Sequence, residues 1–262
     1  MPGYSLRFSS LARWAALEAA FRAAHDHGAT TCEVDIVQTR DGEIAVLHDL
    51  LLDRTTNGTG AVNDVDMADI AELDAGSWFG PDFAGERVPS LVRTLEETRP
   101  LDMGLEIEVK EKRGLDGYTE ALRRTLQDPK DTERVMLISF DHAYLKELKA
   151  ANPGIKTGGI VHERYGDPLA VMRSANLDQM CIDLAVFDMD DARRLKDAGY
   201  SIRCHAYKPE IMEKARKSGL KWHDLLAKAL EEGLIDTLSG DDVAWLATFD
   251  AERKRAQMLV AL

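Results

Sequence analysis

Segments rich in apolar and β-branched residues recur along this chain, and stretches with helical periodicity separate most of them. This alternation predicts βα units and a parallel sheet. With one hairpin arm set aside, eight strands are predicted, at residues 4–8, 31–37, 104–109, 135–140, 157–161, 179–182, 201–205 and 235–238. The 262 residues, 45% of them hydrophobic, suffice for the core of one large domain. We therefore expect an α/β fold, a (β/α)8 TIM barrel over residues 1–262, with its active site at the carboxyl ends of the strands.

Residues 39–49 interrupt the βα alternation. Thr39-Arg40-Asp41-Gly42 is a turn that leads directly into the apolar residues 43–47. So short a connection can join only antiparallel strands. The sequence therefore predicts a hairpin arm that folds over the barrel mouth and carries His48. Residues from about 50 to 89 have no strong strand pattern and are predicted to form a small cap inserted after the second strand.

The chain is acidic, with a formal net charge of -13. This balance argues against nucleic acid or an anionic membrane as the main partner. Three widely spaced cysteines indicate neither a disulfide framework nor structural zinc, and they suit a reducing compartment. No apolar run resembles a signal peptide or is long enough to span a bilayer. We expect a cytoplasmic protein without stable membrane insertion, with a homo-oligomer left open.

Acidic residues occur at alternate positions in two neighbouring predicted strands. Because alternate residues of a strand share a face, Glu33 and Asp35 point the same way. Glu108 and Lys110 share a face in the next barrel strand. Inward carboxylates on two parallel strands repel one another unless a cation lies between them. Mg²⁺ and Ca²⁺ both prefer carboxylate oxygens, so the sequence predicts one divalent cation, Mg²⁺ or Ca²⁺, bound by Glu33, Asp35 and Glu108.

A lysine and a histidine complete the predicted catalytic group. Lys110 lies one step beyond Glu108 on the same face and is placed to hold a phosphoryl oxygen. His48 has the only side-chain type whose unperturbed pKa suits proton donation near neutral pH. With a metal site beside them, these two residues predict metal-assisted cleavage of a small-molecule phosphodiester.

A series of motifs extends over residues 19–110. They are Gly28-Ala29, Glu33-Val34-Asp35, Thr39-Arg40-Asp41-Gly42, His48-Asp49, Leu52-Asp53-Arg54-Thr55-Thr56-Asn57-Gly58, Leu73-Asp74-Ala75-Gly76-Ser77-Trp78-Phe79 and Glu108-Val109-Lys110. The residues of these motifs and their order resemble those of the glycerophosphodiester phosphodiesterase family, which has a phosphatidylinositol-phospholipase-C-like barrel. The resemblance implies a barrel, a divalent metal, and hydrolysis of a glycerophosphodiester to glycerol 3-phosphate and an alcohol.

The resemblance also implies roles for single residues. Glu33, Asp35 and Glu108 match the positions of the family's metal ligands. His48 matches the general acid, and Lys110 matches a phosphate contact.

The first strand and the following helix depart from the family pattern. The family's His-Arg-Gly is replaced by Leu6-Arg7-Phe8, which keeps Arg7 as a phosphate contact. Leucine cannot accept a proton, so the histidine expected to act as general base is missing. The Glu-Asn pair of the family is replaced by Ala15 and Ala16. His205, at another strand end, is a candidate substrate contact and replacement base.

Three functions remain open on these residues. The first is metal-dependent hydrolysis of glycerophosphodiesters. The second is a catalytically impaired or silent homologue that keeps the metal and phosphate pocket. The third is a phosphodiesterase with a changed substrate, in which His205 serves as base.

Overall fold

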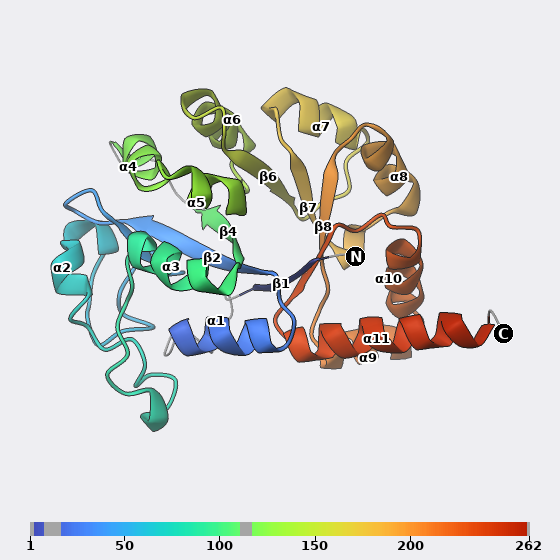
Figure 1. Ribbon diagram of the computed structural model, residues 1–262, viewed down its shortest axis with the longest axis horizontal. Coiled ribbons are helices and arrows are strands. Elements are labelled where there is room, and N and C mark those ends of the chain that lie inside the picture. The colour runs from blue at the N-terminus through green and yellow to red at the C-terminus, as the bar shows by residue number, and fades with distance from the viewer. Residues whose placement is uncertain (1–2, 8–16, 111–116, 261–262) are drawn as a thin grey trace.

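The structure is a computed structural model that describes residues 3–7, 17–110 and 117–260. Within these residues nine strands form one sheet, and eight parallel strands close into a barrel through the pairing of β1 with β2 (Figure 1). The barrel strands are β1 (Gly3–Arg7), β2 (Thr31–Gln38), β4 (Gly104–Val109), β5 (Val135–Ser139), β6 (Lys156–Val161), β7 (Gln179–Asp183), β8 (Ser201–His205) and β9 (Thr237–Gly240). The predicted (β/α)8 barrel is confirmed.

Helices cover the outside of the curled sheet (Figure 1). They are α1 (Leu17–Asp26), α3 (Leu91–Thr98), α4 (Tyr118–Thr125), α5 (Pro129–Arg134), α6 (His142–Ala151), α7 (Pro168–Ala175), α8 (Met189–Asp197), α9 (Pro209–Lys217), α10 (Trp222–Glu231) and α11 (Val243–Val260). Short 3₁₀ turns lie at Val62–Asp64, Pro81–Phe83, Arg99–Leu101 and Leu184–Val186. No helix in the described ranges is long and apolar enough to cross a membrane.

Most strand boundaries agree with their predictions to within one residue, and the last strand differs by two. The last barrel strand was expected at residues 235–238, whereas β9 runs from Thr237 to Gly240. Leu234 and Ile235 are buried in the connection that precedes β9. Apolar residues buried in a loop have the same composition as a strand, and periodicity alone does not separate the two.

The hairpin arm is β3 (Ile44–Val46), which pairs antiparallel with β2 as predicted. Gly42 closes the turn with a φ of 80°, a conformation that L side chains rarely adopt. The pairing places Val46 opposite Ile36, and the Leu47 N–H donates to the Asp35 carbonyl at 3.0 Å. The arm therefore runs back along β2 and brings His48 to the level of Asp35.

The insertion after β3 forms a cap with its own apolar core, and it extends to one side of the barrel with α2 (Met67–Ile70) (Figure 1). The buried side chains of this core are Val37, Ala45, Leu47, Leu52, Val62, Met67, Ile70, Ala75 and Val88. Because Val37 belongs to β2 and Ala45 to β3, the cap packs directly on the strands that carry the site. The chain then returns to α3, whose first turn is capped by the Ser90 hydroxyl, as it accepts the Arg93 N–H.

Candidate active site

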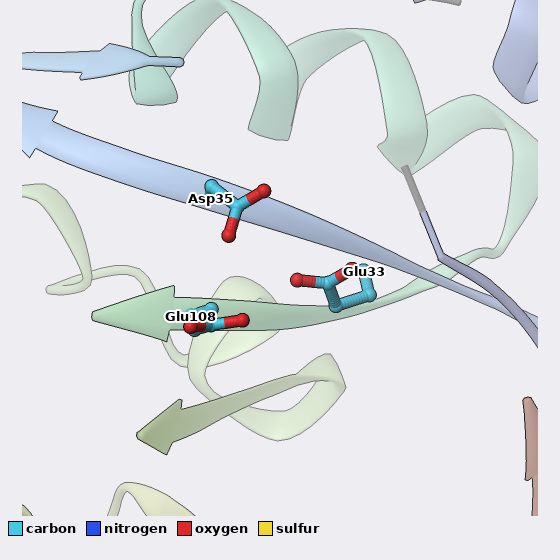
Figure 2. Close-up of side chains that lie close together, drawn as sticks. All are labelled: Glu33, Asp35 and Glu108. Carbon is cyan, nitrogen blue, oxygen red and sulfur yellow. The ribbon is translucent and has the colours of Figure 1, made fainter. Parts of the chain in front are cut away.

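Three buried carboxylates meet inside the barrel. Glu33 and Asp35 project from β2 and Glu108 from β4, and their oxygens converge (Figure 2). One oxygen of each lies within 4.8 Å of the others. The strand register explains this, because Asp35 lies directly beside Glu108 on the neighbouring strand. We refer to Glu33, Asp35 and Glu108 as the acidic cluster. Within the described residues it is the only group of three or more metal-ligating side chains of this kind.

Lys110 lies against the acidic cluster. Its Nζ is 3.0 Å from Asp35 Oδ1 and 3.2 Å from Glu108 Oε1. Burial by itself would lower the lysine pKa, but the two carboxylates outweigh it and the pKa of Lys110 is raised. The ammonium therefore stays protonated, and its 21% exposed side chain can still reach a ligand at the mouth.

Asp35 is completely buried within the cluster. Burial raises the pKa of Asp35 to about 6, with Glu108 adding to the shift, while Lys110 and His48 act against it. Its Oδ2 is buried and accepts no hydrogen bond within the described residues. A buried carboxylate oxygen without a donor is costly unless a cation occupies that side.

A second buried charge pair lies deeper in the barrel. Arg203 Nε is 2.8 Å from Glu106 Oε2, and the Ser5 hydroxyl donates to the same oxygen at 2.7 Å. Although burial opposes it, the carboxylates, with Glu106 first, hold the pKa of Arg203 above its ordinary value. Glu106 is thus neutralised by the protein itself.

The charges of the barrel interior fit a divalent cation. Among the described side chains, the acidic cluster and Glu106 supply four carboxylates, and Lys110 and Arg203 supply two cations. Among these side chains the carboxylates outnumber the cations by two, a balance that suits one divalent ion. Oxygens bound to one Mg²⁺ or Ca²⁺ lie at most about 4–5 Å apart, twice the usual metal–oxygen distance. The spacing and chemistry of the acidic cluster therefore suit such an ion.

His48 is held at the barrel mouth by its neighbour. Its Nδ1 lies 2.6 Å from Asp49 Oδ1, and Arg54 contacts both carboxylate oxygens of Asp49. The bonds from Arg54 first, and that from His48, lower the pKa of Asp49 to about 2 against the effect of burial. An ionised Asp49 only accepts, so His48 Nδ1 carries the hydrogen and Nε2 is the ring atom left for a substrate.

The other predicted site residues are His205 and several residues that the structure describes only in part or not at all. Arg7 is the last residue of β1, beside Glu33 in the register, but its side chain and that of Leu6 lie outside the described part. Ala15 and Ala16 also fall outside the described residues. His205 is buried at the end of β8, where its Nδ1 is 3.4 Å from the Ser239 hydroxyl. Its role as a substrate contact stays a prediction.

Two charged side chains that contact groups of the site region were missed from the sequence. Arg203 and His205 are two residues apart on β8, so their side chains share one face of the strand. If His205 faces the barrel interior, Arg203 does so too, and this spacing was the signal available in the sequence. Arg54 belongs to a recognised motif, but only the folded cap brings it to Asp49.

The sequence matches the model of the Glycerophosphoryl diester phosphodiesterase family over residues 18–233. The chain belongs to this family. The match spans every strand from β2 to β8 and includes the whole acidic cluster, Lys110 and His48.

Characterised sequences of the same family share part of the chain. It is 40% identical over 141 residues to the glycerophosphodiester phosphodiesterase of Caldanaerobacter subterraneus, a match that covers 53% of this chain and 58% of that protein. It is 33% identical over 162 residues to a glycerophosphodiester phosphodiesterase of Bacillus subtilis, covering 56% of this chain and 54% of the relative. The chain thus spans little more than half the length of these relatives.

Solved structures of the family have the same fold. A phosphodiesterase of Oleispira antarctica, solved in complex with its product sn-glycerol-3-phosphate, superposes with a TM-score of 0.79 at 24% identity and covers 96% of this chain and 97% of its own. The glycerophosphodiester phosphodiesterase of Agrobacterium tumefaciens gives a TM-score of 0.76 at 23% identity, covering 95% and 100%. At this identity the likeness establishes the barrel.

Proposed function

We propose that the chain is a metal-dependent phosphodiesterase that hydrolyses glycerophosphodiesters to glycerol 3-phosphate and an alcohol. One observation carries the proposal: three buried carboxylates converge beside a protonated lysine at the carboxyl ends of adjacent barrel strands. Membership of the glycerophosphoryl diester phosphodiesterase family supports the reaction class.

The acidic cluster would hold the divalent ion, which when bound supplies Lewis-acid stabilisation of the phosphate oxygens. Lys110 binds a second phosphoryl oxygen and offsets the charge that builds there. Arg7 and His205, at the ends of β1 and β8, are assigned to substrate contact.

His48 acts on the leaving group. Water adds to phosphorus and releases one of its protons to the surrounding water, the bond from phosphorus to the alcohol oxygen breaks, and His48 Nε2 donates a proton to the departing alkoxide. The ionised Asp49 stabilises the charged imidazole before that transfer. Leu6 stands where the family has its base histidine, and loss of a general base typically costs about 10²–10⁴-fold in rate, so we expect slow turnover.

The test is release of glycerol 3-phosphate from glycerophosphocholine, measured with Mg²⁺, with Ca²⁺ and with a chelator. We expect release only with metal, and none from Glu108→Gln. Glu120→Gln is the matched control, because Glu120 is an exposed acid that pairs with Arg123 on the outer helix α4. No release by the wild-type chain with either metal at high enzyme concentration would reject the proposal for this substrate.

A second candidate is a silent homologue that binds metal and phosphate ligand, and Leu6, Ala15 and Ala16 favour it. It predicts calorimetric binding of glycerol 3-phosphate without turnover. It also predicts no gain of activity when Leu6→His, Ala15→Glu and Ala16→Asn are combined. A strong gain in that triple variant would instead identify an impaired enzyme.

A further inference from the structure

Arg54, a residue of the cap, forms an ion pair with Asp49, which follows the proposed general acid His48 in the sequence. Its Nε contacts Asp49 Oδ2, and its Nη2 donates to Asp49 Oδ1 at 2.8 Å. The guanidinium therefore holds both oxygens of the carboxylate that receives His48 Nδ1 at 2.6 Å. A planar two-bond pair of this kind fixes the plane of the carboxylate as well as its charge.

Arg54 also lies beside the ring of Trp78. The Arg54 guanidinium carbon is 5.9 Å from the centre of the indole ring, within cation–π range. The ring itself is fixed, because its Nε1–H donates to the Ala75 carbonyl at 2.8 Å. Arg54 is thus held between a carboxylate at the barrel mouth and an aromatic ring of the cap.

The carboxylate of Asp74 stabilises the loop that carries Trp78. It accepts the N–H groups of Gly76 and Ser77, each at 2.8 Å, the Ser77 hydroxyl at 2.7 Å, and the Gly85 N–H at 3.0 Å. The loop is closed tightly, since a Cβ at Gly76 would lie 1.8 Å from the Phe83 carbonyl oxygen. Only glycine fits there.

The two halves of the cap are joined at Asn57. The Asp74 N–H donates to the Asn57 side-chain oxygen at 2.8 Å, and the Asn57 N–H donates to the Asp74 carbonyl at 3.0 Å. This exchange links the segment that carries Arg54 to the loop that carries Trp78. Two motifs that contribute no metal ligand and no proton donor therefore meet around Arg54.

We propose that Arg54 is a positioning residue for the phosphodiesterase reaction: anchored on Trp78 of the cap, it orients Asp49, and Asp49 orients His48 so that Nε2 faces the leaving group. The role of the cap is then to hold this series of contacts. The inference rests on the proposed function and adds to it the residue that aligns its general acid.

The size of the effect follows from where these groups lie. The Arg54 side chain is 39% exposed, and an exposed ion pair contributes little to folding. The outer partners that orient the histidines of metal sites are worth more, typically about 10- to 100-fold in activity, and we take the same range for the orientation of His48. We therefore expect Arg54→Ala to fold normally and to lower kcat by about 10- to 100-fold with little change in KM.

The leaving group separates positioning from general damage. A choline ester of glycerol 3-phosphate needs protonation of its alkoxide, whereas a p-nitrophenyl ester has a leaving group stable as an anion. Arg54→Ala should lower kcat for the choline ester and leave kcat for the aryl ester nearly unchanged. Equal losses on both substrates would overturn the proposal.

Arg40→Ala is the matched control. Arg40 also makes two bonds to one aspartate at the edge of the cap, at 2.8 and 2.7 Å to Asp66, but it has no contact in common with His48. It should change neither rate. Arg54→Lys, which keeps the charge without the planar fork, should lie between the wild type and Arg54→Ala, and Trp78→Phe should lose less than Arg54→Ala.

A double variant and a spectroscopic measurement complete the test. In a His48→Ala background Arg54→Ala should cause no further loss, because the histidine it aligns is gone; a full additional loss contradicts the proposal. Ring ¹⁵N shifts of His48 should show hydrogen on Nδ1 in the wild type and a mixture of both tautomers in Arg54→Ala. An unchanged tautomer would overturn the positioning role even if the chain hydrolyses no phosphodiester, whereas an inactive wild type with the expected tautomer change rejects only the proposed function.

Discussion

The barrel interior holds two groups of buried carboxylates that the protein treats differently. Glu106 is paired with Arg203 and also accepts the Ser5 hydroxyl, so its charge is neutralised within the fold. The acidic cluster places three carboxylates around one ammonium, Lys110. The two groups share strand β4, on which Glu106 lies two residues before Glu108. A buried acid that is paired with its own cation supports the fold. Buried carboxylates that outnumber the cations beside them indicate a site that binds a metal ion.

Removal of Arg203 should give the largest effect. Arg203→Met leaves Glu106 buried without its cation, which typically costs about 3–5 kcal/mol of unfolding free energy. Urea unfolding with a chelator present measures it. The double variant Arg203→Met with Glu106→Gln should recover most of the loss, because the orphaned charge is gone. A loss as small as that of an exposed pair, below about 1 kcal/mol, would erase the distinction between the two groups.

Removal of an acid from the cluster should act in the opposite direction. The pKa of Asp35 is about 6 in the fold against an ordinary 3.8, so the folded protein binds this proton more tightly than the unfolded chain does. The resulting stability is present below pH 4 and is lost as the pH rises through about 6. Without metal, Asp35→Asn should therefore be more stable than the wild type at pH 7.5, by about 1–3 kcal/mol.

The same variant should have no such advantage at pH 4, where the wild-type carboxyl is already protonated. Urea unfolding in chelator at the two pH values provides the comparison. An Asp35→Asn variant that is less stable than the wild type at pH 7.5 would show that the fold neutralises the cluster without an added ion.

The smallest expected effect is the change of metal affinity with pH. Because a ligand carboxyl must lose its proton to bind the ion, calorimetric affinity for Mg²⁺ or Ca²⁺ should weaken by about tenfold for each pH unit below 6. Asp35→Asn should bind neither ion measurably, and Glu120→Gln should titrate as the wild type does. Affinity that is constant from pH 7.5 down to pH 5 would remove Asp35 from the ligand set.

Several parts of the site could be predicted because they depend on local geometry. The alternation of side chains along one strand was enough to put Glu33 and Asp35 on one face. The short turn at residues 39–42 was enough to predict an antiparallel arm that carries His48. These inferences need only the two-residue period of a strand and the limited reach of a tight turn.

Contacts between distant segments could not be predicted in this way. The pairing of Glu106 with Arg203 joins β4 to β8, and the contacts around Arg54 join two motifs of an irregular cap. No periodicity specifies either of them. They depend on how the barrel closes and on how the cap core packs against β2 and β3.

The sequence by itself determined which residue types this protein can use and which of them share a strand face, because those properties follow from side-chain chemistry and from the pleat of a single strand. The tertiary structure decided which acids are neutralised and which are left for a cation. That outcome depends on strand register and barrel closure, which put Asp35 beside Glu108 and bring Arg203 across the barrel to Glu106.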